Sequence, residues 1–347
     1  MNYNERHGRL RRRAELLSRL RKFFADRGFL EVETPLLDRE IIPELHIEPF
    51  AVESDASSRE LTARRSGAGD ATTASPASRW LAATGEALWL QASPELHMKR
   101  LLAEGLPAIY QVTRSFRYGE RGQLHNPEFT IVEWYRTGDT MEAGMELLDA
   151  LCQEVASARP AVKTTYRQAF LEHAGVDPHV ASCDELAGTT RRLGIAVPDA
   201  TNRDDRDEWL NLLLAMAVEP KLGAAGPEIL YDYPASQSSL AATVVREDGV
   251  EVAERFELYW RGIELANGFH ELTDAAVLRR RLEKVNEDRA AYDRPPLLLP
   301  EQLLKAMEDP GLPPCSGCAL GFDRLAMLAC GATSIDDVVA FPWRIEP

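Results

Sequence analysis

The chain contains two β-rich segments separated by one short polar stretch. The first is AIYQVTRSFR (108–117), the second is EFTIVEWYR (128–136), and the stretch between them is YGERGQLHNP (118–127). β-Branched and aromatic residues favour strands, and a short polar connection containing Gly, Asn and Pro favours a hairpin. A hairpin of this length restricts the chain to folds that contain an antiparallel sheet.

Further strand signals return after a largely helical middle region. We expect strands in EILYDYP (228–234), in VAERFELYWRGIELANGF (252–269) and at the start of CALGFDRLAMLACG (318–331), and a short strand from Phe29 to Pro35. Helices are predicted at about 9–27, from Pro94 onward with Ser93 as the cap, and at about 141–158, 166–174 and 204–218. Because these elements do not alternate regularly, the pattern predicts an α+β fold with a mainly antiparallel sheet.

Residues 54–79 differ in kind from the rest of the chain. Their sequence, SDASSRELTARRSGAGDATTASPASR, holds few large apolar residues and has no periodicity. Such a composition buries too little apolar surface to fold by itself, so we expect a mobile insertion and not a domain boundary. Residues 80–91 then predict one arm of a hairpin.

Composition and charge narrow the function classes. The chain has 347 residues, of which 45% are hydrophobic and 27% charged, and its formal net charge is −15. Nucleic acid is therefore not the default partner, and the basic run at residues 6–22 is better explained as the solvated face of an amphipathic helix. No segment reaches the roughly 18 apolar residues of a membrane helix, and the N-terminus lacks a signal core, so we expect a cytoplasmic protein without a membrane partner.

The five cysteines favour reduced thiols over a disulfide framework, because their number is odd and no secretory signal is present. Cys315 and Cys318 form a single CxxC pair. A zinc site would need two more ligands, and a redox pair would need a thioredoxin-like surrounding, so both remain less favoured alternatives.

The polar stretch after the first strand concentrates groups that bind phosphate. It carries or adjoins Arg117, Glu120, Arg121, His125 and Asn126. Guanidinium groups hold phosphate oxygens in a bidentate manner, whereas solvation alone would also explain a charged loop. The loop is therefore a candidate phosphate site that needs support from its surroundings.

The strand after this loop supplies that support. Phe129 offers a ring on which a purine can stack, and Glu133 and Tyr135 give a polar face to an otherwise apolar run. Polar groups on an interior face cost free energy unless something pairs with them. A ligand with a cationic end would be that partner.

Three glutamates spaced by seven, Glu257, Glu264 and Glu271, lie in RFELYWRGIELANGFHEL (255–272). A solvated helical stripe would explain the spacing, but the residues between them are strand and turn formers. If the chain turns between Trp260 and Arg261, Glu257 lies directly opposite Glu264. Opposed like charges repel unless a cation bridges them, so we favour a Mg²⁺ pair there.

A second bend is expected at Asn267-Gly268, where it would bring Glu271 back to the same pocket. The last constellation is Gly317–Met327, in which Gly317, Ala319 and Gly321 allow a ligand to approach the backbone.

Asp323 and Arg324 begin a helix in this last constellation, and the N-terminus of a helix favours anions. Close packing of strand on helix would explain the glycines but not an arginine in so apolar a setting. Arg324 is therefore a candidate contact for a purine face or a phosphate.

These segments resemble the class II aminoacyl-tRNA synthetases of the lysyl type. FFADRGFLEVETPLL resembles their motif 1 (about 9–37), SFRYGERGQLHNPEFTIVEWY their motif 2 (about 110–136) and GCALGFDRLAML their motif 3 (about 317–331). The resemblance implies one synthetase-like catalytic domain over residues 1–347, which uses ATP and Mg²⁺. We expect the N-terminal anticodon-binding domain of lysyl-tRNA synthetases to be missing, because the motif 1 helix starts almost at residue 9.

This shortened form is similar to the family of ligases that modify a protein instead of tRNA. That resemblance implies activation of (R)-β-lysine, transfer to a lysine of elongation factor P, and a homodimer formed through motif 1, with tRNA an improbable partner. Ala319 supports it, because lysyl-tRNA synthetases have glycine there and the added methyl group disfavours α-lysine. An α-lysine enzyme acting on tRNA or a small molecule is the alternative; an inactive paralogue is opposed by the intact motif residues.

The resemblance also implies roles for individual residues. Arg117 and Arg324 are the expected catalytic residues, since they hold the ATP phosphates, while Phe129 and Arg324 enclose adenine. The expected ATP contacts are Arg117, Tyr118, Gly119, Glu120, His125, Asn126, Phe129, Glu264, Leu265, Gly321 and Arg324. The expected substrate contacts are Ser93, Glu95, Glu133, Tyr135, Asn267, Glu271 and Ala319, and the expected metal ligands are Glu257 and Glu264.

Motif 2 departs from the family at one position. Lysyl-type enzymes read FRNE, whereas this chain reads FRYGE, so that Gly119 stands where the adenine-recognising glutamate is expected. Glu120, one residue further on, is the candidate replacement.

Overall fold

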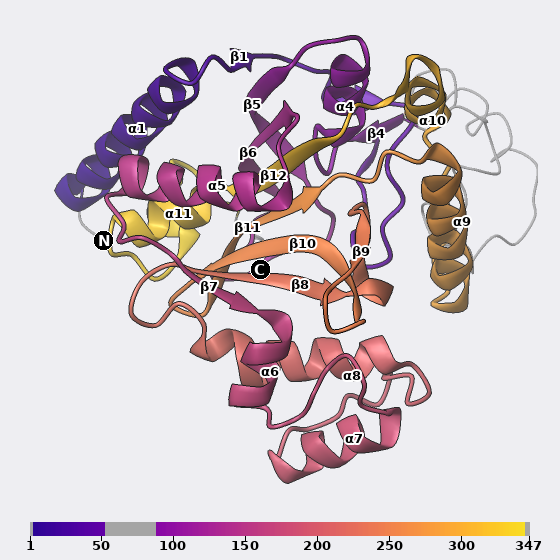
Figure 1. Cartoon of the computed structure of the whole chain (residues 1–347). Helices are drawn as coiled ribbons and strands as arrows, with labels where there is room; N and C mark the ends of the chain where they lie inside the picture. Colours follow the sequence, from indigo (N-terminus) through magenta and orange to yellow (C-terminus); the bar gives the residue numbers. More distant parts are fainter. Residues whose placement is uncertain (1–2, 53–87, 344–347) are drawn as a thin grey trace, which may run out of the picture.

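A nine-stranded mixed sheet organises the chain, for which the computed structural model describes residues 3–52 and 88–343 (Figure 1). The strand order is β1–β5–β6–β12–β11–β10–β8–β7, with β9 beside β10. The bounds are β1 Leu30–Glu31, β5 Ala108–Phe116, β6 Glu128–Thr137, β7 Val162–Thr165, β8 Glu228–Pro234, β9 Thr243–Val245, β10 Glu251–Trp260, β11 Ile263–His270 and β12 Cys315–Gly321. Only β1–β5 and β7–β8 pair in parallel, so the predicted α+β fold with a mainly antiparallel sheet is confirmed.

Helices pack against the sheet in three groups (Figure 1). The first group covers one face and consists of α1 (Tyr3–Ala25), α5 (Met141–Ala156) and α11 (Phe322–Ala329). The second lies on the face that carries the predicted site and consists of α4 (Glu95–Ala103), α9 (Ala275–Ala291) and α10 (Glu301–Ala306). The third packs against β8 and consists of α6 (Tyr166–His173), α7 (Cys183–Arg192) and α8 (Arg206–Leu213). None of the described helices is long and apolar enough to cross a membrane.

The motif 1 helix, α1, is fixed to the sheet by aromatic packing. Phe24 stacks on Tyr110 of β5 with ring centroids 4.4 Å apart, and its centroid lies 5.3 Å from Trp134 of β6. All three side chains are almost completely buried. Motif 1 therefore packs directly against the strands of motif 2.

Several predicted element bounds need correction. α1 spans Tyr3–Ala25 instead of 9–27, and the strand expected after it is reduced to β1. α4 has Pro94 at its N-cap, while Ser93 accepts a hydrogen bond from the Glu95 backbone N–H at 3.1 Å. The helix expected at 204–218 is α8 followed by a π-helical turn, Leu214–Val218. The helices α7, α9 and α10 were not predicted.

The register of the β10–β11 hairpin also differs from the prediction. The turn residues are Arg261 and Gly262, both with positive φ, as a two-residue type I′ turn requires. This two-residue turn and an irregularity beside Leu258 and Tyr259 together set the pairing, so that Glu257 lies opposite Asn267 and not opposite Glu264. The second bend expected at Asn267-Gly268 was wrong, because both residues lie within β11.

A small second sheet has the order β2–β4–β3, formed by β2 (Leu37–Asp38), β3 (Ala51–Val52) and β4 (Leu88–Leu90). β4 is the described end of the hairpin arm expected at residues 80–91. The predicted insertion at 54–79 lies outside the described residues.

Candidate active site

One row of side chains crosses four neighbouring strands on the same face of the sheet. Glu133 of β6 lies opposite Ala319 of β12, Ala319 lies opposite Asn267 of β11, and Asn267 lies opposite Glu257 of β10. Side chains on a strand alternate between faces, so Val132 and Trp134 point into the core with α1 and α5 instead. Strand pairing therefore gathers four of the sequence-predicted residues, which are up to 186 positions apart, into one line.

A cavity of about 760 Å³ opens over this row. It is lined by most of the predicted residues: Ser93, Glu95, Arg117, Glu120, His125, Asn126, Phe129, Glu257, Glu264, Leu265, Asn267, Ala319, Gly321 and Arg324. The predicted residues that do not line it are Tyr118, Gly119, Glu133, Tyr135 and Glu271. Of these, Glu133, Tyr135 and Glu271 are buried beside the cavity, and Tyr118 is 62% exposed and faces Phe50 at a ring distance of 5.3 Å.

The motif 2 loop and β6 form one wall of the cavity. The Arg117 guanidinium lies over the Phe129 ring, 5.0 Å from its centroid, and 3.8 Å from a carboxylate oxygen of Glu120. Arg117 Nε and Asn126 Oδ1 are buried and have no hydrogen-bond partner within the described part of the chain. Buried polar atoms of this kind indicate a wall built for a polar ligand. Gly119 adopts a positive φ of 80°, which suits a turn, while Glu120 faces the cavity.

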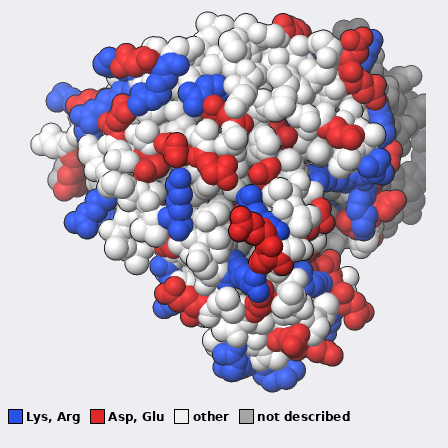
Figure 2. Space-filling model, in the orientation of Figure 1, with Lys and Arg blue, Asp and Glu red and all other residues white. Residues whose placement is uncertain are grey.

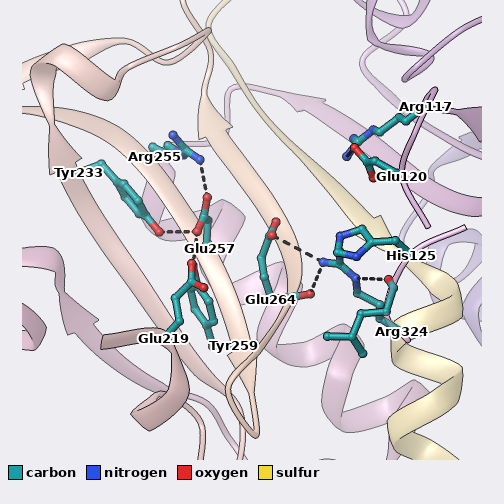
Figure 3. A network of polar contacts seen from close by, with 11 residues as sticks. Arg117, Glu120, His125, Glu219, Tyr233, Arg255, Glu257, Tyr259, Glu264 and Arg324 are labelled. Atoms are coloured by element: carbon teal, nitrogen blue, oxygen red, sulfur yellow. Dashed lines mark hydrogen bonds and ion pairs between the residues drawn. The ribbon is translucent and has the colours of Figure 1, made fainter. Parts of the chain in front are cut away.

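Arg324, the first-turn arginine of α11, also lines the cavity and lies beside His125 of the motif 2 loop (Figure 3). It donates to the backbone oxygens of Leu124 (3.2 Å) and Glu264 (2.8 Å), and its Nη2 lies 2.7 Å from His125 Nε2. Burial and the Arg324 charge lower the pKa of His125, so a neutral ring accepts this hydrogen bond. The guanidinium is therefore held in place before any ligand binds.

The predicted metal ligands have different surroundings (Figure 3). Glu257 is paired with Arg255 and accepts hydrogen bonds from the hydroxyl groups of Tyr233 and Tyr259, the latter at 2.6 Å. Glu264 lies 3.6 Å from Arg324, and no hydroxyl group among the described residues donates a hydrogen bond to its carboxylate. Burial and the Glu257 charge both raise the pKa of Glu264.

This arrangement changes the argument for a metal. The prediction that the two carboxylates lie directly opposite each other was wrong. Arg255 also balances the charge of Glu257, so repulsion between the carboxylates does not by itself require a cation. Glu264 has a 3.6 Å contact with Arg324 and faces the cavity, so it is available to a further cation. Mg²⁺ is commonly held by one or two carboxylates together with substrate phosphates, and the two glutamates facing a phosphate-binding wall fit that pattern. No group of three or more His, Cys, Asp or Glu residues that could hold a metal occurs in the described residues.

A second, deeper group of carboxylates lies beside the row. Glu133 accepts hydrogen bonds from Ser93 Oγ (2.7 Å) and from the Tyr135 hydroxyl (2.6 Å). Burial, and secondarily the Glu95 charge, raise the pKa of Glu133 to about 8. Burial likewise raises the pKa of Glu271 to about 7, although Lys99 opposes the shift. Such an accumulation of buried carboxylates creates a site for ammonium groups.

The CxxC pair does not form a site. Cys315 packs in the cluster with α4 and α10, whereas Cys318 packs in the cluster with α1 and α5. The two thiols therefore point to opposite faces of β12. Burial raises the pKa of both, as in inert structural cysteines.

Sequence reasoning missed several residues of the site. Arg255 lies two residues before Glu257 and on the same strand face, and Lys99 lies one helical turn after Glu95, so periodicity alone could have indicated both. Glu44 and His46, in the segment between the two small strands β2 and β3, line the cavity without any signal in the sequence. Burial raises the pKa of Glu44 to about 7.

Comparisons with known proteins agree with this geometry. Residues 1–344 match the model of the tRNA synthetases class II (D, K and N). The chain is 44% identical to proteins named "Elongation factor P--(R)-beta-lysine ligase" from Salmonella typhi, Salmonella gallinarum and Salmonella paratyphi B, over 332 residues that cover 96% of this chain and 94% of each relative. The chain therefore belongs to the class II tRNA synthetases of the D, K and N type.

Proposed function

We propose that this protein activates (R)-β-lysine with ATP and transfers it to the ε-amino group of a lysine on elongation factor P. The observation that carries the proposal is the placement of Glu95, Glu133 and Glu271 beside a cavity walled by Arg117 and Arg324. Such a site joins a pocket for a diamino acid to a pocket for a nucleoside triphosphate. The names of the 44% identical relatives give the same substrate and acceptor.

The first step forms an acyl-adenylate. The substrate carboxylate, aligned by Asn267, attacks the α-phosphorus. The bond between the α-phosphorus and the oxygen that links it to the β-phosphate breaks, and pyrophosphate leaves. Arg117 and Arg324 both line the cavity and would stabilise the negative charge that develops on the phosphate. Phe129 supplies the ring beneath adenine, and no side chain needs to act as a covalent nucleophile. The chemistry depends on position and charge neutralisation.

Mg²⁺ would be held by Glu257 and Glu264 together with phosphate oxygens, and it would neutralise and orient the triphosphate. Glu264 is the more available ligand, because Glu257 is already paired with Arg255. Tyr233 and Tyr259 fix the orientation of Glu257.

In the second step, the ε-amine of the acceptor lysine attacks the carbonyl carbon of the adenylate, and AMP leaves as the new amide bond forms. A protein acceptor agrees better than tRNA with a net charge of −15. On the face shown in Figure 2, acidic and basic side chains are interspersed. Since the acceptor is a translation factor, we infer that the enzyme acts in the cytoplasm, as one catalytic domain.

We also infer a homodimer formed around motif 1. Leu30, Leu36 and Leu37 are each at least 41% exposed. An exposed apolar edge next to a short strand is typical of a protein interface. Sedimentation should give twice the monomer mass of 38.7 kDa.

Pyrophosphate exchange tests the proposed function. (R)-β-Lysine should stimulate exchange much more than α-lysine, and labelled β-lysine should pass to elongation factor P. Preference for α-lysine with transfer to tRNA would replace the proposal by a tRNA-charging function. The absence of exchange with either isomer would indicate an inactive paralogue.

Ala319 gives a prediction about the choice between the isomers. Its methyl group stands between Glu133 and Asn267 at the floor of the cavity, so Ala319→Gly should admit an α-amino group. One methyl group changes discrimination by roughly tenfold or more, and we expect kcat/KM for α-lysine to rise by about that factor relative to (R)-β-lysine. The matched control is Ala266→Gly, which removes a methyl group from the core side of β11, the face opposite to Asn267 and the cavity. An unchanged ratio in Ala319→Gly would show that this methyl does not select the isomer.

A further inference from the structure

Lys99 is a buried cation with no part in the mechanism above. It lies on α4, one turn after Glu95, and only 2% of its surface is exposed. Its Nζ is 2.5 Å from Glu95 Oε1 and 2.7 Å from Glu271 Oε2. One ammonium group thus joins a carboxylate on α4 to a carboxylate just after β11.

The groups around Lys99 keep it charged. Burial lowers its pKa, but the facing carboxylates of Glu271 and Glu95 outweigh burial and raise it. A buried ammonium flanked by two carboxylates remains ionised throughout the neutral range. The titratable groups around Lys99 and its two carboxylate partners are Glu95 on α4, Glu133 and Tyr135 on β6, His270 and Glu271 at and just after the end of β11, and Cys315 on β12.

Lys99 does not contact all the carboxylate oxygens of its two partners. It contacts one oxygen of each partner, and Glu271 Oε1 is buried without a hydrogen-bond partner in the described residues. Both oxygens of Glu133, by contrast, already accept hydrogen bonds from Ser93 and Tyr135. A donor from outside the protein is therefore needed at Glu271.

The charges of this pocket match a substrate with two ammonium groups. Once the ammonium groups of the substrate lie beside Glu95, Glu133 and Glu271, they favour the ionised form of all three carboxylates, and the single ammonium of Lys99 then leaves two negative charges. A diamino acid brings two ammonium groups to this region, while its carboxylate lies toward Asn267 and the phosphates. Without Lys99, one carboxylate would lack a counter-charge, and a buried carboxylate in that condition takes up a proton.

We propose that Lys99 is a positioning residue that sets the specificity of the pocket: it holds Glu95 and Glu271 in place and reduces the negative charge to the value that a diamino acid neutralises. This inference rests on the proposed function. Lys99 does not contact the reacting atoms. It acts through the two carboxylates.

The test is the Lys99→Met variant in pyrophosphate exchange. We expect KM for (R)-β-lysine to rise by about 30-fold or more at pH 7, since truncating one member of a buried charge pair has effects of this size. KM for ATP should stay within about threefold of wild type, because Lys99 does not line the ATP cavity. In the variant, KM for (R)-β-lysine should fall as pH rises, since the carboxylates lose a nearby cation and ionise only at higher pH.

Two further variants make the outcome decisive. Lys284→Met removes a lysine from an exposed (i, i+4) pair on α9 and should change nothing. Lys99→Met/Glu95→Gln restores two negative charges, so it should bind (R)-β-lysine better than Glu95→Gln alone, and this comparison still holds if Lys99→Met fails to fold.

Three results would overturn the inference: an unchanged KM for (R)-β-lysine in Lys99→Met, a parallel loss of ATP affinity and melting temperature, or a double variant weaker than Glu95→Gln. Wild-type protein that shows no exchange with (R)-β-lysine would instead refute the proposed function, and the inference with it.

Discussion

Replacing Arg324 by alanine is expected to lower the rate of (R)-β-lysine-dependent pyrophosphate exchange by about 10²–10³-fold. Removal of one preorganised group that stabilises developing charge has an effect of this order. Arg324 is preorganised here, because Leu124, Glu264 and His125 already hold its guanidinium at the edge of the cavity. The loss should therefore appear mainly in kcat, whereas KM for (R)-β-lysine should change little.

The controls for Arg324→Ala separate catalysis from folding. Arg279→Ala removes an exposed arginine on α9 that pairs with Glu301, and it should leave exchange unchanged. Arg324→Lys retains the charge without the planar fork, so we expect an intermediate rate. Melting curves show whether each variant is folded, and Arg324→Lys decides the matter if the alanine variant is not. Full exchange activity in a folded Arg324→Ala protein would refute the proposed role.

Much of the site was predictable because it lies on regular strands. The β5–β6 hairpin was correct to within two residues at each end, and alternation along β6 correctly placed Glu133 and Tyr135 on the face opposite Trp134. The resemblance to class II synthetases was confirmed by the family match and by 44% identity to the ligases. Local periodicity and short motifs are the signals that a sequence carries most reliably.

The remaining features depend on contacts between distant segments. A two-residue turn at Arg261 and Gly262 and a one-residue irregularity beside Tyr259 together moved the partner of Glu257 from Glu264 to Asn267. No local pattern predicts where such an irregularity occurs. Arg255 pairs with Glu257 and weakens the repulsion on which the metal argument was based. Glu44 reaches the cavity because its backbone oxygen accepts a 2.7 Å hydrogen bond from the buried Arg289, which lies 245 residues away. Such partners become visible only in three dimensions.

The Glu264→Gln variant is expected to raise the Mg²⁺ concentration needed for half-maximal exchange by about 10–100-fold or more. Loss of an outer-shell group alone has effects of 10–100-fold on metal affinity, and a direct ligand should contribute at least as much. Folding should be little affected, because the one ion pair of the Glu264 side chain within the described residues is a 3.6 Å contact with Arg324. Exchange measured over a Mg²⁺ titration gives the result, with Glu301→Gln as the exposed control.

Glu257→Gln should behave differently, and the contrast tests the assignment of both residues. Glu257 is only 6% exposed and is paired with Arg255, so the amide leaves a partly buried guanidinium without its counter-charge. Breaking such a pair costs about 3–5 kcal/mol of unfolding free energy, so we expect a lower melting temperature. The Mg²⁺ concentration needed for half-maximal exchange should rise less than in Glu264→Gln. If Glu264→Gln keeps the wild-type Mg²⁺ requirement, the metal is not held at this pair, and the effect of Glu257→Gln is purely structural.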